Sequence, residues 1–293
     1  MQHPLYLIGY ASGIAGASCH TGEGPLVIQK SPFLLNMNLP LQWKKIIQPL
    51  QQQSLLRDDE MIRQVCLELA HEVAELVRYK QRFSIMGGDH TSAIGTWSGV
   101  YDTLHDQGNI GLVWIDAHMD SHTPETTESG HIHGMPLASL MGYGYGTLTS
   151  ILHDAPKLQP ENVCLIGVRS FERGEAELLK RLNVRVYFIE EVKERGFIPV
   201  LQEAVQQVSR HTIGYGISLD LDSIDPSEAP GVDVPEKNGL SASEVCEGLL
   251  QVMSDPKLIG TEIVEFDPTR DKAHLTEKLI ANLIKIIANN DKL

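Results

Sequence analysis

The stretch Gly111-Leu-Val-Trp-Ile-Asp-Ala-His-Met-Asp120 joins an uninterrupted apolar run to a short segment rich in carboxylates and imidazole. An apolar run without alternation predicts a strand buried on both faces, as strands are in a parallel sheet covered by helices. Such runs recur along the chain, so we expect a sheet whose strands are mainly parallel. The other runs are Leu5–Gly9, Phe83–Met86, Val163–Val168, Val184–Ile189, Gly214–Leu219 and Leu258–Glu265.

Segments with a helical spacing of apolar residues lie between many of these runs. Asp58–Tyr79 repeats apolar residues along one helix face. Ser241 followed by Glu244 predicts a capping box at the start of a helix that reaches Met253, and Thr276–Ala288 predicts a last amphipathic helix. Strands covered by helices on both faces predict a three-layer α/β/α fold with a mainly parallel sheet. We interpret residues 1–293 as one domain.

The net charge of the chain indicates which classes of binding partner to expect. The chain has 38 acidic and 24 basic side chains, a formal charge of −14. Binding to nucleic acid needs clustered Lys and Arg, and binding to an anionic membrane surface needs basic residues as well. We therefore expect neither partner. The acidic balance is compatible with a cationic small-molecule substrate, although many proteins are acidic for solubility alone.

Cysteine usage and hydropathy indicate the compartment. The cysteines are scattered without CxxC spacing, so we expect neither a disulfide framework nor a structural zinc site. The start of the chain, Met1-Gln-His-Pro4, lacks the basic and apolar regions of a secretory signal. The apolar runs are far shorter than the ~20 residues that span a bilayer. We expect a cytoplasmic protein.

The loops that follow the predicted strands carry the chemistry. Ligands of open α/β sheets bind beyond the carboxyl ends of the strands. In an extended backbone, residues i, i+2 and i+4 point the same way. We therefore expect Asp116, His118 and Asp120 to converge just past the edge of the sheet.

Two further motifs add ligands to this edge. Asp220 and Asp222 show the same two-residue stagger, and Gly87-Gly88 lets the chain turn sharply before His90. Together the motifs supply four carboxylates and two imidazoles, which would repel or take up protons unless cations were bound. Carboxylates with some imidazole and no thiolate favour Mn²⁺ over Zn²⁺. Six ligands fit two ions that share bridging carboxylates, with a bridging water or hydroxide as the nucleophile.

At these residues the sequence resembles the ureohydrolase (arginase/agmatinase) family, most closely the bacterial type of arginase. The likeness covers nearly the whole chain, and its motifs are specific to the family in order and spacing. The motifs are Gly87-Gly-Asp-His-Thr91, Asp116-Ala-His-Met-Asp120, Ser218-Leu-Asp-Leu-Asp-Ser-Ile-Asp-Pro226 with Ala229-Pro-Gly231, and Glu262-Ile-Val-Glu-Phe-Asp-Pro268.

The resemblance implies a parallel-sheet α/β fold with two Mn²⁺ ions per chain and assembly into trimers or hexamers. It implies that Glu265 binds a guanidinium group and that His133 shuttles a proton, a role that suits imidazole. Asp120 counts as a catalytic residue as well as a ligand. By motif, one ion takes His90, Asp116, Asp120 and Asp220, and the other takes Asp116, His118, Asp220 and Asp222.

The loop after Asp120 resembles arginases more than agmatinases, and there the positions of His122, Thr127 and Ser129 contact the α-carboxylate of the substrate. Glu172 stands where arginases commonly have an Asp near the α-amino group. His122 and Asp267 both stand where Asn is usual, and Asp267 has no assigned role.

We therefore expect an enzyme, a hydrolase that cleaves L-arginine to L-ornithine and urea by attack of metal-bound hydroxide. An agmatinase, a guanidino-acid hydrolase or a formimidoylglutamase of the same family remains an alternative. More remote alternatives are a zinc deacetylase-like enzyme and a non-catalytic protein that binds cationic amino acids.

Overall fold

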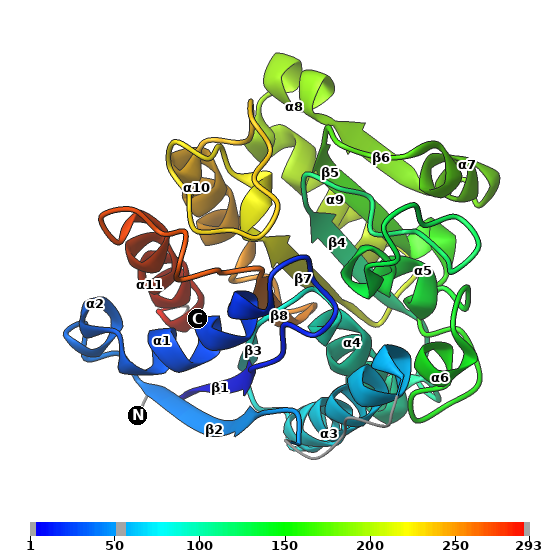
Figure 1. Ribbon diagram of the computed structural model, residues 1–293, viewed down its shortest axis with the longest axis horizontal. Helices are drawn as coiled ribbons and strands as arrows, with labels where there is room; N and C mark the ends of the chain where they lie inside the picture. Colours follow the sequence, from blue (N-terminus) through cyan, green and yellow to red (C-terminus); the bar gives the residue numbers. More distant parts are fainter. Residues whose placement is uncertain (1–3, 51–56, 290–293) are drawn as a thin grey trace.

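The computed structural model describes residues 4–50 and 57–289. Its centre is an eight-stranded sheet with the order β2-β1-β3-β8-β7-β4-β5-β6, in which every strand pair is parallel (Figure 1). The strands are β1 Leu5–Tyr10, β2 Leu41–Ile47, β3 Phe83–Gly87, β4 Ile110–Ile115, β5 Val163–Val168, β6 Arg185–Phe188, β7 Gly214–Asp220 and β8 Leu258–Val264.

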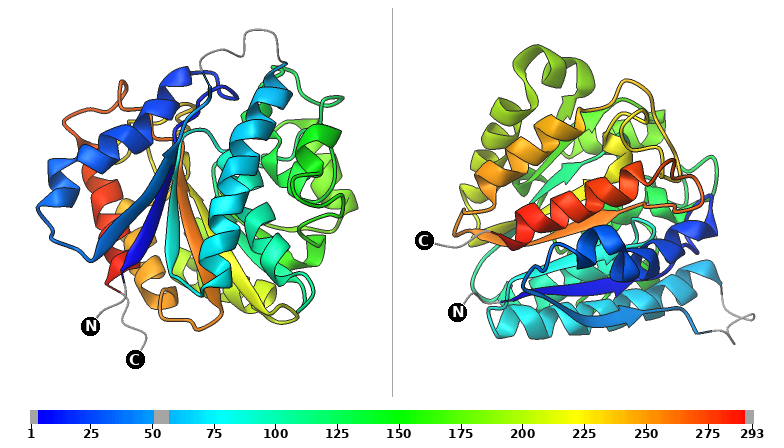
Figure 2. Two further views of the ribbon diagram at one scale, coloured as in Figure 1. Left: turned by 90° about the horizontal axis from the view of Figure 1, so that it is seen from below. Right: turned by 90° about the vertical axis from the view of Figure 1, so that its left-hand side faces the viewer.

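Helices cover both faces of the sheet, so that the molecule has three layers (Figure 2). One face carries α1 Gly24–Lys30, α2 Pro32–Leu35, α8 Ile189–Arg195, α9 Phe197–Ser209, α10 Ala242–Val252 and α11 Leu275–Ala288. The other face carries α3 Asp58–Arg78, α4 Ser92–Leu104, α5 Pro136–Leu140, α6 Gly146–Thr149 and α7 Arg173–Arg181.

Alternation along the strands divides the apolar side chains between two cores. In β4, Val113 and Ile115 pack under α8–α11, whereas Leu112 and Trp114 pack under α3, α4 and α5. All six residues of β4 are buried, because helices lie on both sides of them. This double burial is the reason why the strands read as uninterrupted apolar runs, and it confirms the predicted α/β/α fold.

Two details differ from the prediction. The edge strand β2, Leu41–Ile47, is not among the predicted strands, because its half-exposed side chains include lysines and do not form an apolar run. The helix α10 begins as predicted, but the prediction of a capping box at Ser241 is wrong. The Ser241 hydroxyl bonds the hydroxyl of Ser243 instead of the helix backbone.

The order of the strands brings four distant segments together. β3, β8, β7 and β4 are consecutive neighbours in the sheet, although they are far apart in the sequence. Since all four run in the same direction, the loops that follow them leave the same edge. The last residues of these strands and the loops after them carry the three predicted ligand motifs and Glu265.

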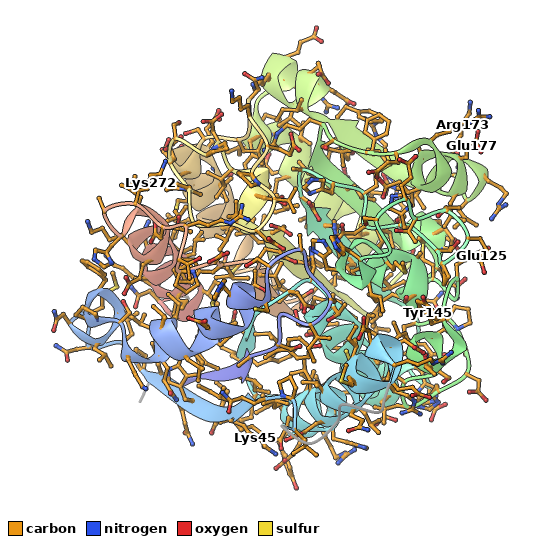
Figure 3. The ribbon with its side chains drawn as sticks, in the orientation of Figure 1. Lys45, Glu125, Tyr145, Arg173, Glu177 and Lys272 are labelled. Carbon is orange, nitrogen blue, oxygen red and sulfur yellow. The ribbon has the colours of Figure 1, made fainter. Side chains whose placement is uncertain are left out.

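Exposed charged side chains such as Lys45, Glu125 and Lys272 lie at the periphery of the molecule (Figure 3). All four cysteines are free. Within residues 4–50 and 57–289, no helix is long and apolar enough to cross a membrane. The expectation that the chain lacks a secretory signal was based on its first four residues, and residues 1–3 lie outside the described residues.

Close packing of β7 against α4 makes Gly216 a test of the fold. A Cβ atom on Gly216 would lie 1.8 Å from the Trp97 ring, which is fully buried. We expect Gly216→Ala to lower the free energy of unfolding by about 1–3 kcal/mol because the core is overpacked. Urea denaturation measures it. Gly146→Ala is the control, because nothing lies within 4 Å of its Cβ. Equal stability of the two variants would contradict this packing.

Candidate active site

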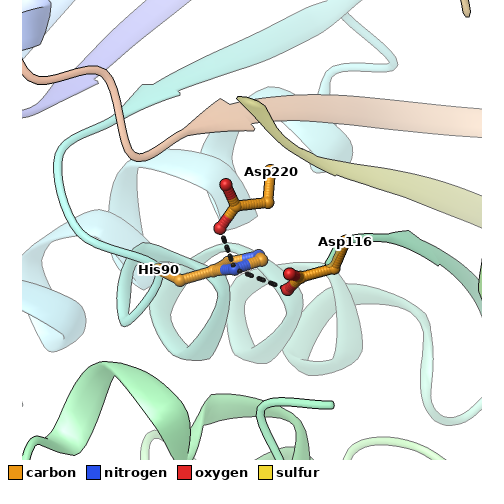
Figure 4. A group of neighbouring side chains, drawn as sticks. All are labelled: His90, Asp116 and Asp220. Atoms are coloured by element: carbon orange, nitrogen blue, oxygen red, sulfur yellow. Dashed lines mark ion pairs between the residues drawn. The ribbon is translucent and has the colours of Figure 1, made fainter. Parts of the chain in front are cut away.

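The first ligand group surrounds the imidazole of His90, which lies just after β3. Its Nδ1 atom lies 3.0 Å from Asp120 Oδ2, 3.1 Å from Asp220 Oδ2 and 3.4 Å from Asp116 Oδ2. Figure 4 shows how Asp116 and Asp220 approach the ring from two sides. The ring is buried, and Nδ1 makes no hydrogen bond despite its three acidic neighbours. Such convergence of donor atoms without hydrogen bonds is the geometry expected of a metal site.

A second group lies beside the first and shares Asp116. The Nδ1 atom of His118 lies 2.9 Å from Asp222 Oδ2 and 3.5 Å from Asp116 Oδ1. In each group, donor atoms of three residues lie within 4.8 Å of one another and can hold an ion. The two oxygens of Asp116 thus face different imidazoles, as a bridging carboxylate would.

Residues of the strands fix these side chains. The Trp114 indole stacks on His90 with ring centroids 4.0 Å apart, and its Nε1 donates to Asp116 Oδ2 at 2.8 Å. On the other side of the ring, His90 Nε2 hydrogen-bonds Ser218 Oγ on β7 at 2.8 Å. Hydrogen bonds of this kind orient the ring and leave Nδ1 available to bind a metal ion.

The structure brings the six predicted ligand residues together, but not through the extended backbone expected from the sequence. β4 ends at Ile115, and Asp120 has a left-handed φ of 47°. Asp222 lies in a 3₁₀ turn, where its N–H donates to Asp220 Oδ1 at 2.8 Å. The residues converge because the chain turns sharply after each strand.

The electrostatics of the cluster favour bound cations. Asp116, Asp120, Asp220 and Asp222 are all buried. Burial, together with the neighbouring carboxylates of Asp222 and Asp116, raises the pKa of Asp220 well above its usual value. Divalent cations would remove this repulsion, and the oxygen-rich donor set with imidazole suits them. The residues therefore fit a pair of metal ions.

Glu265, which is buried, and His133, which is half-buried, form a pair beside the ligands. Glu265 follows β8 with a left-handed φ of 67°. Its Oε1 accepts from the backbone N–H of His90 at 2.8 Å and faces His133 Nδ1 at 3.1 Å. Burial raises the pKa of Glu265 to about 7 despite His133. Although burial alone would lower the pKa of His133, Glu265 raises it to about 9. The Oε2 atom of Glu265 is buried without a hydrogen bond.

Glu265, His133 and four of the predicted ligands form the floor of a pocket of about 310 Å³. The four ligands are His118, Asp120, Asp220 and Asp222. The rim includes Glu128, Glu172 and Glu236, and none of the described residues that line the pocket is Lys or Arg. A cavity with this charge favours a cationic ligand.

The predicted substrate residues are only partly brought together. His122, Ser129 and Glu172 line the pocket, whereas Thr127 does not. His122 Nε2 lies 2.7 Å from Glu172 Oε2, and its Nδ1 lies 3.2 Å from Thr126 Oγ1. Both ring nitrogens of His122 are therefore engaged by protein groups.

Glu175, which is not among the residues predicted from the sequence, lines the pocket and is buried. Its carboxylate accepts from Ser121 N at 3.2 Å and from Glu172 N at 2.9 Å. Burial raises the pKa of Glu175 to about 8. The spacing of three residues after Glu172 is the signal of a capping box at the start of α7, which forms here.

Comparisons with known proteins agree with this geometry. The arginase family model matches residues 30–288. The chain is 38% identical over 220 residues to an arginase of Brevibacillus brevis, covering 75% of this chain and 73% of the relative. The crystal structure of arginase from Bacillus subtilis superposes with a TM-score of 0.88 at 31% identity, covering 99% of this chain and 100% of that one.

A third relative is an arginase of Entamoeba histolytica, whose crystal structure is a complex with L-ornithine. It superposes with a TM-score of 0.89 at 28% identity, covering 99% of this chain and 100% of that one. Sequence and fold thus agree over most of the chain, and the chain belongs to the arginase family of hydrolases.

Proposed function

We propose that the chain is a single-domain, binuclear manganese hydrolase that cleaves L-arginine to L-ornithine and urea. The observation that carries the proposal is the lone Oε2 of Glu265, buried without a hydrogen bond beside the two ligand groups and on the floor of an acidic pocket. An orphaned carboxylate oxygen of this kind suits the N–H groups of a guanidinium.

The six predicted ligands would hold the two ions, with Asp116 facing both groups. When bound, Mn²⁺ would supply a Lewis acid that lowers the pKa of a water, so that a nucleophile would exist near neutral pH. The carboxylates of this chain, including Asp120, would lose their mutual repulsion at the same time. Trp114 and Ser218, which are buried, hold the His90 ring in place whether or not the ions are bound.

Glu265 would hold the guanidinium, since Oε1 is fixed by the His90 N–H and Oε2 is free. His133 would supply the proton to the leaving amine. Its Nδ1 faces Glu265, which leaves Nε2 to carry the proton toward the substrate. With its pKa raised to about 9, His133 carries that proton at neutral pH.

The end of the substrate opposite the guanidinium would contact the rim of the pocket. Glu172 suits an ammonium group, and the Ser129 hydroxyl suits a carboxylate. A guanidino acid or formimidoylglutamate, which presents carboxylate without an amine, would meet no Lys or Arg among the described lining residues. Agmatine is the second candidate substrate, because His122 is bonded to Glu172 and Thr127 lies outside the pocket, which leaves few donors for a carboxylate.

We infer from the family that the protein works in the cytoplasm as a homo-oligomer, a trimer or hexamer, without nucleic-acid or membrane partners. Light scattering of the purified protein tests the assembly.

The substrate is tested with a panel of guanidino compounds. The protein loaded with Mn²⁺ should release urea from L-arginine, because the floor binds guanidinium and the rim offers groups for both the amine and the carboxylate. Urea, ammonia and formamide are scored separately. Urea from agmatine but not arginine would reject arginine and keep the family chemistry. Turnover of none of these compounds would reject the proposal.

The shared ligand predicts a specific metal loss. Asp116→Ala should reduce Mn²⁺ retention at both positions and abolish turnover, because both imidazoles face this carboxylate. Elemental analysis after gel filtration measures retention. Asp225→Ala is the matched control, since that carboxylate accepts from turn residues such as Ser227. Full Mn²⁺ content in Asp116→Ala would contradict a shared ligand.

The guanidinium site predicts the effect of Glu265→Gln. Losing a charge-assisted contact to Oε2 should lower kcat/KM for arginine by roughly 100-fold, since such contacts contribute about 1.5–3 kcal/mol. Steady-state kinetics with measured Mn²⁺ content separates this from metal loss. A variant with unchanged kcat/KM would remove Glu265 from the substrate site.

A further inference from the structure

The segment Ala11–Ser18, here called the strap, follows β1 and crosses the carboxyl edge of the sheet (dark blue in Figure 1). The peptide groups of Ala15 join two parts of the site. Ala15 N donates to Asp89 Oδ2 at 3.1 Å, and Ala15 O accepts from the backbone N–H of His133 at 3.2 Å. His133 is thus held from two sides, by the strap at its backbone and by Glu265 at its ring.

The far end of the strap is anchored by two buried carboxylates from different loops. Ser18 N donates to Asp233 Oδ2 at 3.0 Å, and Ser18 Oγ donates to Asp267 Oδ2 at 3.1 Å. Asp233 and Asp267 are 3% and 0% exposed. Arg270 approaches them from outside, at 3.4 Å from Asp267 Oδ2 and 3.8 Å from Asp233 Oδ1. A single serine therefore joins the strap to the loops after β7 and β8.

The fit between the strap and its anchor is close. A Cβ atom on Gly16 would lie 2.8 Å from Asp233 Oδ2, so the backbone can approach the carboxylate only because residue 16 has no side chain. The position of Ala15 is therefore set by Ser18 and Asp233 on one side and by Asp89 on the other. Asp89 itself is held by Thr91, whose N–H donates to its Oδ1 at 3.0 Å.

The chemistry of the anchor accounts for an Asp at position 267. Its Oδ1 accepts from Thr269 N at 2.9 Å and from Thr269 Oγ1 at 2.6 Å. Its Oδ2 accepts from Ser18 and faces the Arg270 guanidinium. An Asn side chain has one acceptor oxygen and an amide that donates, so it cannot accept from both sides or pair with Arg270.

We propose that Ser18, held by Asp267 and Asp233, is a positioning residue that sets the place of His133 through the Ala15 carbonyl. The inference rests on the proposed function only for its kinetic consequence. The strap does not line the pocket at Ser18 or Ala15, so it acts through His133 and not on the substrate. Loosening the anchor then lets the His133 backbone shift relative to Glu265.

The test compares Ser18→Ala with the wild type. Amide hydrogen exchange at His133 should rise, because its acceptor Ala15 O is no longer fixed. In the Mn²⁺-loaded enzyme, kcat should fall about fivefold, while KM and Mn²⁺ content stay within about twofold, because proton transfer depends on placement. Ser18→Thr keeps the hydroxyl and should restore both measurements. Asp267→Asn should change both in the same direction as Ser18→Ala.

The matched control is Thr269→Val, which removes a hydroxyl bond to the other oxygen of Asp267 without touching the strap. Equal loss of kcat in Thr269→Val and Ser18→Ala would overturn the proposal, as would unchanged exchange at His133 in Ser18→Ala. A wild type without turnover on any guanidino compound would reject the proposed function, and the exchange comparison would still decide the role of Ser18.

Discussion

Mutual repulsion among four buried carboxylates is the constraint on which the rest of the site depends. Asp116, Asp120, Asp220 and Asp222 lie around two imidazoles at the edge of a sheet that is covered on both faces. Burial and neighbouring carboxylates raise the pKa of Asp120, Asp220 and Asp222, so bound cations would help to keep these groups ionised. Two divalent ions would offset part of the formal charge of −14 and organise the floor of the pocket.

The parallel sheet makes this crowding possible. Since β3, β8, β7 and β4 are neighbours that run in the same direction, their last residues meet without any element reaching across the molecule. The same arrangement places Glu265 against the backbone of His90, so that the carboxylate proposed to hold the guanidinium is fixed by a ligand loop. The acidic rim with Glu172 and Glu236 then extends a field that attracts cations from solvent.

Much of this could be predicted from the sequence, because the doubly buried strands read as apolar runs and each ligand motif follows one of them. The sharp turn at Asp120 could not, since a left-handed φ leaves no mark in residue spacing. The edge strand β2 was hidden because its half-exposed residues include Lys44 and Lys45.

Contacts between distant loops could not be predicted from the sequence for a different reason. Glu175 is buried by the fold rather than by its own segment, and Asp267 gains its meaning only when Ser18 and Arg270 are placed beside it. Sequence motifs identified the residues proposed to meet the ions and the guanidinium. The side chains that hold them in place became visible only in three dimensions.

Calorimetric titration of the metal-free protein with Mn²⁺ tests the central claim most directly. We expect binding that saturates at two ions per chain, together with a rise in the midpoint of thermal unfolding, because ligands that bind the folded state stabilise it. Saturation at one ion, or no binding and no change in thermal stability, would contradict the claim.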